Sequence, residues 1–307
     1  EEEEEEEVEM MFSQMAPEAS QPIHPVKQSE RNNLENLGTD NKEKIIVALS
    51  RLILFKALEG EPIDRLATFK EANADSTTSD RIVSAVFDEA ATNLSNVFGF
   101  ELRRVPKYLE ESKTLPKKFK DRMYVINDVD GDEDDQEATD LAAHSKAIHS
   151  VHDDSSIEKG LLMICLALAF CKGVPRNDKS RWITDSDLYR LLHSIDENVP
   201  PEPPAAANRK VTATRHYRHD VGTPDVDSLL AKFVHQDYLL KEKASEQQTG
   251  PSSQLVENTF QYAMGPRAAM EIGRKQIVYF CAEVLDEEPD ETMIAEIEQV
   301  EDFMEED

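Results

Sequence analysis

The sequence predicts a mainly α-helical protein with two modules in tandem, each made of helices and a small β-hairpin. Two observations support this prediction. Between residues 41 and 127, stretches with apolar residues at helical spacing precede two short segments in which apolar and polar residues alternate. The same order returns between residues 156 and 285, although no sequence identity repeats between the halves. A length of 307 residues also suits about two domains.

The first predicted helix, from Asn41 onwards, is apolar on two sides. One face carries residues that recur at helical spacing: Ile45, Ala48, Leu49, Leu52 and Ile53. Val47, Leu54 and Leu58 fall on the opposite side of the same helix. A helix of this kind lies either at the centre of its own core or against a partner. Both alternatives are open at this point.

Two further helices and a hairpin complete the first module, residues 41–127. A short helix is expected from Asp64, and Ser79 or Asp80 can cap the helix that follows. That helix ends at Gly99 and has a regular apolar stripe: Val83, Val86, Phe87, Ala90, Leu94 and Val97. The two alternating segments after it, residues 100–105 and 123–126, are expected to pair as strands. Three helices followed by such a hairpin, or wing, are the order of a winged helix.

The second module, residues 156–285, begins with the longest apolar run of the chain. This run extends from Gly160 to Cys171 and is too short to span a bilayer. It is apolar all round, which is typical of a buried core helix. The later elements follow in order: a strand at 181–183, a helix with Thr184 and Asp187 as capping box, an insertion at 196–220, a helix at 226–233, strands at 238–240 and 259–262, and a helix from Pro266 to Leu285.

The net charge of −29 is concentrated in three blocks that contain no Lys or Arg. Residues 1–9 hold 8 acidic residues, residues 127–140 hold 8 and residues 286–307 hold 12. Outside these blocks 35 acidic residues face 34 Lys and Arg. Blocks of like charge repel themselves and bury little. We therefore expect a disordered lead-in over residues 1–40, an acidic linker over residues 128–155 and a disordered acidic tail over residues 286–307.

Motifs for catalysis and for cofactor or metal binding are missing from the sequence. Cys165, Cys171 and Cys281 have no CxxC spacing, so we interpret them as reduced, buried thiols. The acidic string that starts at Asp128 has Gly131 in the wrong place for an EF-hand loop. No phosphate-binding glycine loop, nucleophile elbow or metalloprotease helix occurs. The sequence predicts no enzyme activity, no cofactor, no metal and no small-molecule substrate.

The first wing is the most basic part of the chain. Between residues 101 and 122, Lys and Arg outnumber Asp and Glu by 8 to 4. A basic wing can rest on phosphates without reading base sequence, which suggests double-stranded DNA as a partner. The candidate DNA-binding residues are Arg103, Arg104, Lys107, Lys117, Lys118 and Lys120. The alternative is an ordinary charged surface hairpin.

Four segments resemble the signatures of a known family. They are Leu52–Lys56 with Glu61–Ile63, Phe98–Leu102, Gly160–Ile164 with Phe170–Gly173, and Met264–Ala268. In this order and at this spacing they resemble the MAGE (melanoma-antigen) homology domain, which has a tandem winged-helix architecture. The long acidic insertions make the chain most similar to the MAGE-like non-SMC subunit of the SMC five/six chromosome complex.

This resemblance implies a non-catalytic scaffold in a chromosome maintenance and DNA repair complex, located in the nucleus and associated with chromosomes. It implies a RING-type ubiquitin-ligase subunit and a kleisin as partners, close to duplex DNA, and no membrane. It also places the RING contact on the leucine-rich first helix. The candidate partner-binding residues are Leu52, Ile53, Leu54, Phe55 and Leu58.

Two other functions fit the same two modules. A freestanding winged-helix DNA-binding regulator needs a basic recognition helix in the major groove. The two candidate helices, residues 79–97 and 225–235, carry Arg81 and Lys232 as their only bases, which disfavours this reading. A MAGE adaptor of an unrelated cytoplasmic ubiquitin ligase differs from the first hypothesis in its partners, which the sequence does not name.

Overall fold

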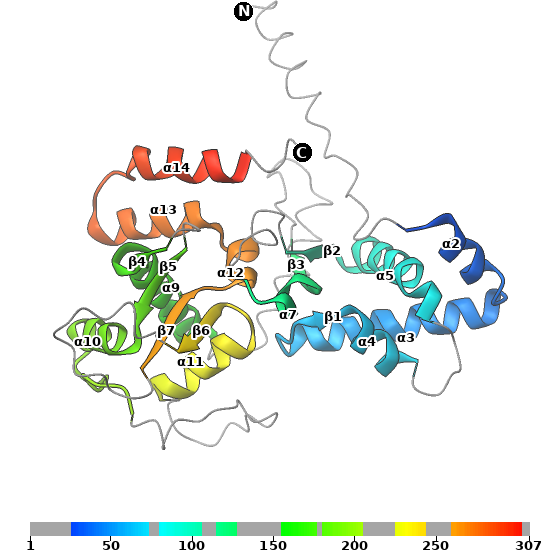
Figure 1. Ribbon diagram of the computed structural model, residues 1–307, viewed down its shortest axis with the longest axis horizontal. Coiled ribbons are helices and arrows are strands. Elements are labelled where there is room, and N and C mark those ends of the chain that lie inside the picture. The colour runs from blue at the N-terminus through cyan, green and yellow to red at the C-terminus, as the bar shows by residue number, and fades with distance from the viewer. Residues whose placement is uncertain are drawn as a thin grey trace, which may run out of the picture.

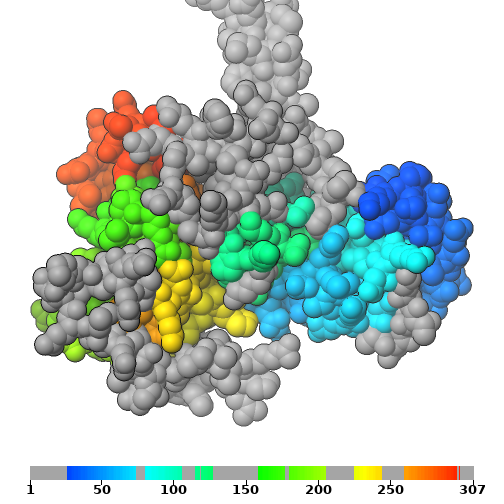
Figure 2. Space-filling model, viewed as in Figure 1, coloured from blue at the N-terminus to red at the C-terminus, as the bar shows by residue number. Residues whose placement is uncertain are grey.

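The computed structural model describes residues 26–73, 80–105, 115–127, 155–176, 180–204, 225–243 and 259–302. Two groups of helices, each with a small antiparallel sheet, lie side by side (Figure 1). Figure 2 shows the segment from α7 (Lys117–Lys120) to β3 (Arg122–Asn127) filling the space between them. The mainly α-helical, tandem winged-helix fold predicted from the sequence is confirmed.

The first module packs its helices around one apolar core and carries a sheet of strand order β1-β3-β2. Leu49, Ile53 and Phe87 are fully buried at the centre of that core. The elements besides β3 are α2 (Gln28–Glu35), α3 (Thr39–Leu58), β1 (Ile63–Asp64), α4 (Arg65–Ala72), the 3-10 turn Asp80–Ile82, α5 (Val83–Phe98) and β2 (Phe100–Arg104).

Local chemistry explains where these elements begin and end. The Asp64 Oδ1 atom accepts a hydrogen bond of 2.9 Å from the Ala67 amide, which caps the start of α4. Gly99 ends α5 with φ of 67°, a left-handed conformation that glycine adopts without a steric penalty. The chain then enters β2, which pairs antiparallel with β3 and sets Arg104 opposite Met123. The predicted first wing is therefore present.

In the second module, α9 (Ser155–Lys172) packs against a sheet of strand order β4-β5-β7-β6. Leu166 of α9 is fully buried in the second core. The Asp187 amide donates to Thr184 Oγ1 at 3.1 Å, as the capping box predicts. The remaining elements are β4 (Val174–Pro175), β5 (Arg181–Thr184), α10 (Asp185–Ile195), α11 (Val226–His235), β6 (Leu239–Lys243), β7 (Phe260–Met264), α12 (Pro266–Glu271), α13 (Gly273–Leu285) and α14 (Glu291–Asp302).

Two expectations about the ends of the folded body are wrong. A disordered lead-in up to residue 40 is contradicted from Gln28 onwards, because α2 buries Leu34 in the first core. A disordered tail is contradicted by α14, which packs against α13 (Figure 1) and buries Ile297. In both segments a few apolar residues at helical spacing are enough to attach a polar helix to a core. Counting charges alone overlooks them.

Other expectations differ in detail or lie outside the described residues. The predicted last helix is two helices, because Gly273 has φ of 76° and starts a new one. Val97 is exposed rather than part of the buried stripe, since it lies in the last turn of α5. The acidic linker before Ser155 lies outside the described residues, as does the insertion beyond residue 204.

Gly265→Ala should destabilise the fold. A Cβ at Gly265 would lie 2.1 Å from the Asp237 carbonyl oxygen and 2.8 Å from the Tyr238 carbonyl carbon, both backbone atoms. Backbone does not rotate away as a side chain does, so such overpacking costs on the order of 1–3 kcal/mol. Urea unfolding measures the change in free energy of unfolding.

Gly160→Ala is the matched control for this test. Nothing lies within 4 Å of a Cβ built at Gly160, which is inside α9. Alanine in a helix interior gains about 0.5–1 kcal/mol over glycine, so this variant should be more stable than wild type. Equal unfolding curves for the two variants would contradict the packing argument.

Candidate interaction surfaces and the junction between the modules

The solvent side of α3 carries three exposed apolar side chains, Val47, Phe55 and Leu58, which we call the apolar strip. Phe55 is 62% exposed. At 100° per residue, these positions fall on one side of the helix. The opposite side is anchored in the first core by Ile45, Ile46, Leu49 and Ile53. Helix α3 is therefore apolar on two sides, and one of them is left uncovered in the described structure.

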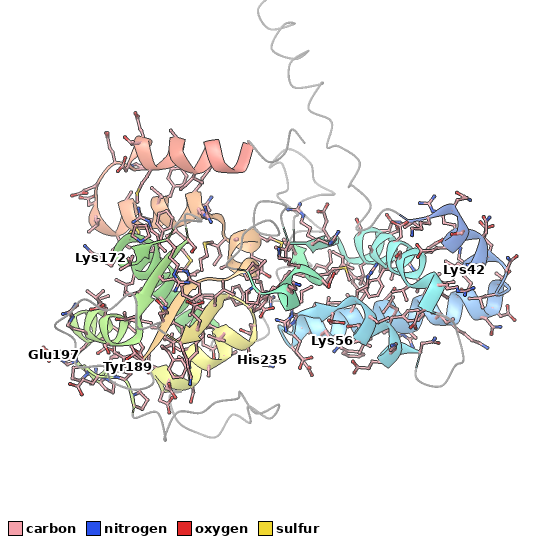
Figure 3. All side chains as sticks on the ribbon, in the orientation of Figure 1. Lys42, Lys56, Lys172, Tyr189, Glu197 and His235 are labelled. Atoms are coloured by element: carbon pink, nitrogen blue, oxygen red, sulfur yellow. The ribbon has the colours of Figure 1, made fainter. Side chains whose placement is uncertain are left out.

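Ion pairs hold the end of α3 next to the strip. Lys56, marked in Figure 3, places its Nζ atom 3.1 Å from a carboxylate oxygen of Glu71 and 3.6 Å from one of Glu61. These contacts join α3 to the turn before β1 and to α4. Helix α4 packs against α3 and adds a further exposed apolar residue, Leu66. Leu66 is absent from the predicted set of partner-binding residues. It lies three positions before Phe69, so helical spacing places both on one side of α4 and does not show that only Phe69 is buried.

The predicted partner-binding residues differ in how far their side chains are exposed. Phe55 and Leu58 are exposed, as a contact surface requires. Ile53 is wholly buried, so its assignment to a partner surface is wrong: it lies on the core face of α3. Leu52 and Leu54 are half-buried, and Leu54 packs against the first core. A substitution at Leu54 would therefore change stability together with any binding.

The predicted basic residues of the first wing do not share one face. Arg103 and Arg104 are neighbours in β2, so their side chains leave opposite faces of the sheet. The Arg103 guanidinium also pairs with Glu101 at 2.8 Å. In α7, Lys117 is exposed and Lys120 is half-buried. Lys107 and the side chain of Lys118 lie outside the described part of the chain.

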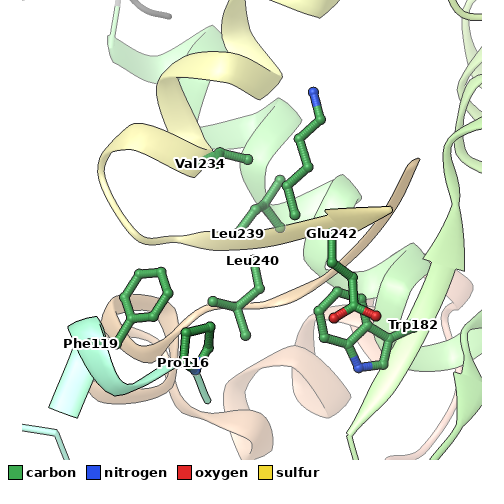
Figure 4. Close-up of a pocket in the computed structure, with 8 residues that line it drawn as sticks. Pro116, Phe119, Trp182, Val234, Leu239, Leu240 and Glu242 are labelled. Atoms are coloured by element: carbon green, nitrogen blue, oxygen red, sulfur yellow. The ribbon is translucent and has the colours of Figure 1, made fainter. Parts of the chain in front are cut away.

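Helix α7 does not sit at the tip of a free hairpin, because it docks on the second module. Phe119 is buried in an apolar cluster that joins the two modules. The members of this junction cluster are Val105, Leu115, Phe119, Tyr124, Trp182, Leu240 and Ala263. A hollow of about 100 Å³ opens beside it, between Pro116 and Phe119 on one side and Trp182 and Leu240 on the other (Figure 4).

A buried carboxylate lies next to the junction cluster. Asp237 stands just before β6 with φ of 63°, and its side chain is 2% exposed. The Arg122 Nη1 atom donates to both of its oxygens, at 2.6 and 2.5 Å, and the Tyr124 hydroxyl donates at 2.8 Å. Both donors come from β3 of the first module. Burial, followed by the charge of Asp237, raises the pKa of Tyr124, so the phenol keeps its proton and continues to donate.

A second polar contact ties the turn after α3 to α12. The Arg267 Nη1 atom donates to the Gly60 carbonyl oxygen at 2.7 Å, and its Nε atom donates to Glu271 at 2.7 Å. The guanidinium also lies over the Tyr238 ring, 4.7 Å from its centre. The Tyr238 hydroxyl donates to Glu271, and burial raises the pKa of this tyrosine above its ordinary value. The modules therefore meet through both apolar packing and buried polar contacts.

Two of the sequence segments that resemble the family signatures lie at this junction. Arg267 belongs to the segment Met264–Ala268, and Gly60 precedes the segment Glu61–Ile63. The model of the MAGE homology domain matches residues 49–275, which is most of the chain. The chain belongs to the MAGE homology domain family. The resemblance seen in the sequence is confirmed.

Among solved structures, this MAGE homology domain is similar to a chain of the Nse1-Nse3-Nse4 complex. The two are 16% identical, with a TM-score of 0.53, over 90% of this chain and 99% of that one. At this level of identity the likeness concerns the fold. No curated protein matches the chain.

Within its described residues, this MAGE homology domain has no group of three or more His, Cys, Asp or Glu side chains placed to hold a metal ion. None of the helices in that part of the chain combines the length and the apolar character needed to cross a membrane. The acidic string from Asp128 lies outside the described residues.

Removing Arg122 should cost more stability than neutralising its partner. Arg122→Ala removes the guanidinium from the Asp237 carboxylate, which stays buried beside the Tyr124 hydroxyl, and we expect this to cost on the order of 3 kcal/mol. Asp237→Asn removes the charge, keeps an acceptor for Tyr124, and retains a residue that tolerates positive φ. Chemical denaturation of both variants measures the difference. A smaller loss for Arg122→Ala than for Asp237→Asn would contradict the account of this junction.

Proposed function

We propose that this chain is a non-catalytic scaffold subunit of an SMC-type chromosome maintenance and DNA repair complex, working on chromosomes in the nucleus. Membership of the MAGE homology domain family supports a scaffold role. The fold likeness to a chain of the Nse1-Nse3-Nse4 complex, over 99% of that chain, supports this kind of assembly. The proposal assigns the chain a RING-type ubiquitin-ligase subunit and a kleisin as partners.

The observation that carries the proposal is the apolar strip on α3. Val47, Phe55 and Leu58 expose large side chains on a helix whose other side is fully committed to the core. When a partner covers such a surface and removes it from water, the free energy of the complex falls. Ion pairs of Lys56 fix the helix end, so the strip is already ordered before binding. We assign this surface to the RING-type subunit.

The junction supports the scaffold role in a second way. The Arg122–Asp237 pair and the Arg267–Gly60 contact hold the two modules in one arrangement. A partner on α3 and a second partner on the other module would then be presented in a fixed relation. The apolar hollow at the junction, beside Phe119 and Leu240, is a surface on which a kleisin segment can place an apolar side chain.

We propose contact with duplex DNA through phosphates rather than through bases. Lys117 is exposed on α7, and the wing around it is the most basic part of the chain. Contacts to phosphates carry no sequence information. The alternative of a freestanding regulator is less well supported, since Lys232 on α11 pairs with Glu158 on α9 at 2.5 Å and so faces the protein. A major-groove reader needs its bases on the exposed side of that helix.

Phe55→Ala should weaken association with a purified RING-type ligase subunit at least tenfold. Burial of a phenylalanine side chain is worth about 1.5–3 kcal/mol, and 1.4 kcal/mol corresponds to a factor of ten in Kd. Because Phe55 is 62% exposed, the variant should melt at the temperature of wild type. Isothermal titration measures the Kd.

Ile195→Ala serves as the matched control, since Ile195 is 59% exposed at the end of α10 in the second module. It should bind the RING-type subunit as wild type does. An unchanged Kd for Phe55→Ala, with an unchanged melting curve, would remove the apolar strip from the interface. Equal losses in both variants would mean that exposed apolar area, rather than this strip, drives association.

The double substitution Lys117→Glu, Lys118→Glu should weaken binding to duplex DNA and reduce its salt dependence. Each phosphate contact that is lost lowers the slope of log affinity against log salt by about 0.9. Fluorescence anisotropy with a short random duplex at several salt concentrations measures this slope. Lys44→Glu is the control, because Lys44 is exposed in α3, away from the wing. Equal slopes for wild type and the double variant would show that the wing is a plain solvated surface.

A further inference from the structure

Two of the three cysteines meet in the second module. Cys171 lies in the last turn of α9 and Cys281 lies in α13, 110 residues later in the chain. Their sulfur atoms are 3.6 Å apart. Cys171 is exposed and Cys281 is half-buried, whereas Cys165 is buried in the second core. The expectation of three buried thiols is therefore wrong for Cys171.

The geometry brings these two thiols close to the distance of a covalent bond. A disulfide has an S–S distance of about 2.05 Å, so the sulfur atoms must approach by roughly 1.5 Å. Helices α9 and α13 already pack against each other, and rotation about χ1 moves a sulfur atom without moving the backbone. One of the two thiols is also open to a reagent in solvent.

We propose that Cys171 and Cys281 are a modification site, a dithiol that a hydroperoxide oxidises to a reversible disulfide between α9 and α13. This site is independent of the partner surfaces proposed above. Cys171 reacts first because it is exposed. Its thiolate attacks one peroxide oxygen, the O–O bond breaks, and Cys171 becomes a sulfenic acid while the other oxygen leaves as an alcohol, or as water from hydrogen peroxide.

Cys281 completes the reaction as the resolving thiol. It attacks the sulfur atom of the Cys171 sulfenic acid, the S–O bond breaks, and the oxygen leaves as water with the proton of Cys281. Two thiols and one hydroperoxide thus give one disulfide, one alcohol and one water. Burial and the hydrogen bond with Cys171 raise the pKa of Cys281 to about 12, so in the reduced protein Cys281 is protonated and does not itself attack the peroxide.

The disulfide would fasten the carboxyl-terminal helices to the second core. Helix α13 packs against α9 and also against α14. Helix α9 supplies side chains to the second core. Since the two cysteines are 110 residues apart, the bond would also restrict the unfolded chain strongly. Oxidation would therefore stabilise this end of the protein without adding a contact elsewhere.

The test uses the full chain, fully reduced and then freed of reductant. Hydrogen peroxide is titrated in, remaining thiols are alkylated, and peptides are mapped by mass spectrometry without reduction. We expect a linked peptide pair containing Cys171 and Cys281, which dithiothreitol separates again. Cys165 should be alkylated only after denaturation, because it is buried. The oxidised protein should melt on the order of 5–10 °C higher than the reduced protein.

Two variants sharpen the result. Cys171→Ser should give neither the linked pair nor the rise in melting temperature, and Cys165→Ala should give both. Recovery of wild-type Cys171 as a sulfinic acid with Cys281 still alkylatable would overturn the proposal. Links found only between Cys171 residues of two molecules would overturn it as well. Both of these contradicting outcomes are measured on wild-type protein and do not depend on the folding of a variant.

Discussion

The buried carboxylate of Asp237 is the constraint on which the arrangement of the two modules depends. A carboxylate that is almost fully removed from water is stable only if charged or polar donors replace its hydration. Here those donors are Arg122 and Tyr124, which both belong to β3 of the first module. Donors of the docked first module therefore help to satisfy the buried charge of the second module.

The same constraint explains why the first wing does not project into solvent. Strand β3 has to lie beside Asp237, and this brings Phe119 of the preceding α7 against Trp182 and Leu240. The Arg267 guanidinium adds a contact to the Gly60 carbonyl, directly after α3. In consequence, the apolar strip on α3 and the surface of the second module keep one spatial relation. A protein that holds partners together rather than performing chemistry benefits from such a fixed relation.

The candidate surfaces show how far residue patterns reach. Helical spacing identified α3 as apolar on two sides; of the residues on its second side, Val47 and Leu58 are indeed exposed, whereas Leu54 packs against the first core. The same spacing does not tell which of Ile53 and Leu54 faces the core most fully, since neighbouring residues lie only 100° apart on a helix. The basic residues of the wing formed one cluster in the sequence, but the alternation of β2 sends Arg103 and Arg104 to opposite faces.

The sequence by itself determined the helices and hairpins of the two modules, the capping box at Thr184 and the family. The predicted cap of α5 at Ser79 or Asp80 is not among these, since α5 starts after Ile82 without a side-chain cap. Helices, hairpins and caps depend on residues close together in the chain, which periodicity and turn signals express directly. Only the tertiary structure decided that α14 is ordered, that Cys171 meets Cys281 and that Asp237 binds Arg122. The partners in these pairs are more than 100 residues apart, and no local pattern encodes which distant residue will lie opposite. Arg122 and Asp237 meet because the two modules pack together, whereas Cys171 and Cys281 meet because α9 packs against α13 within the second module.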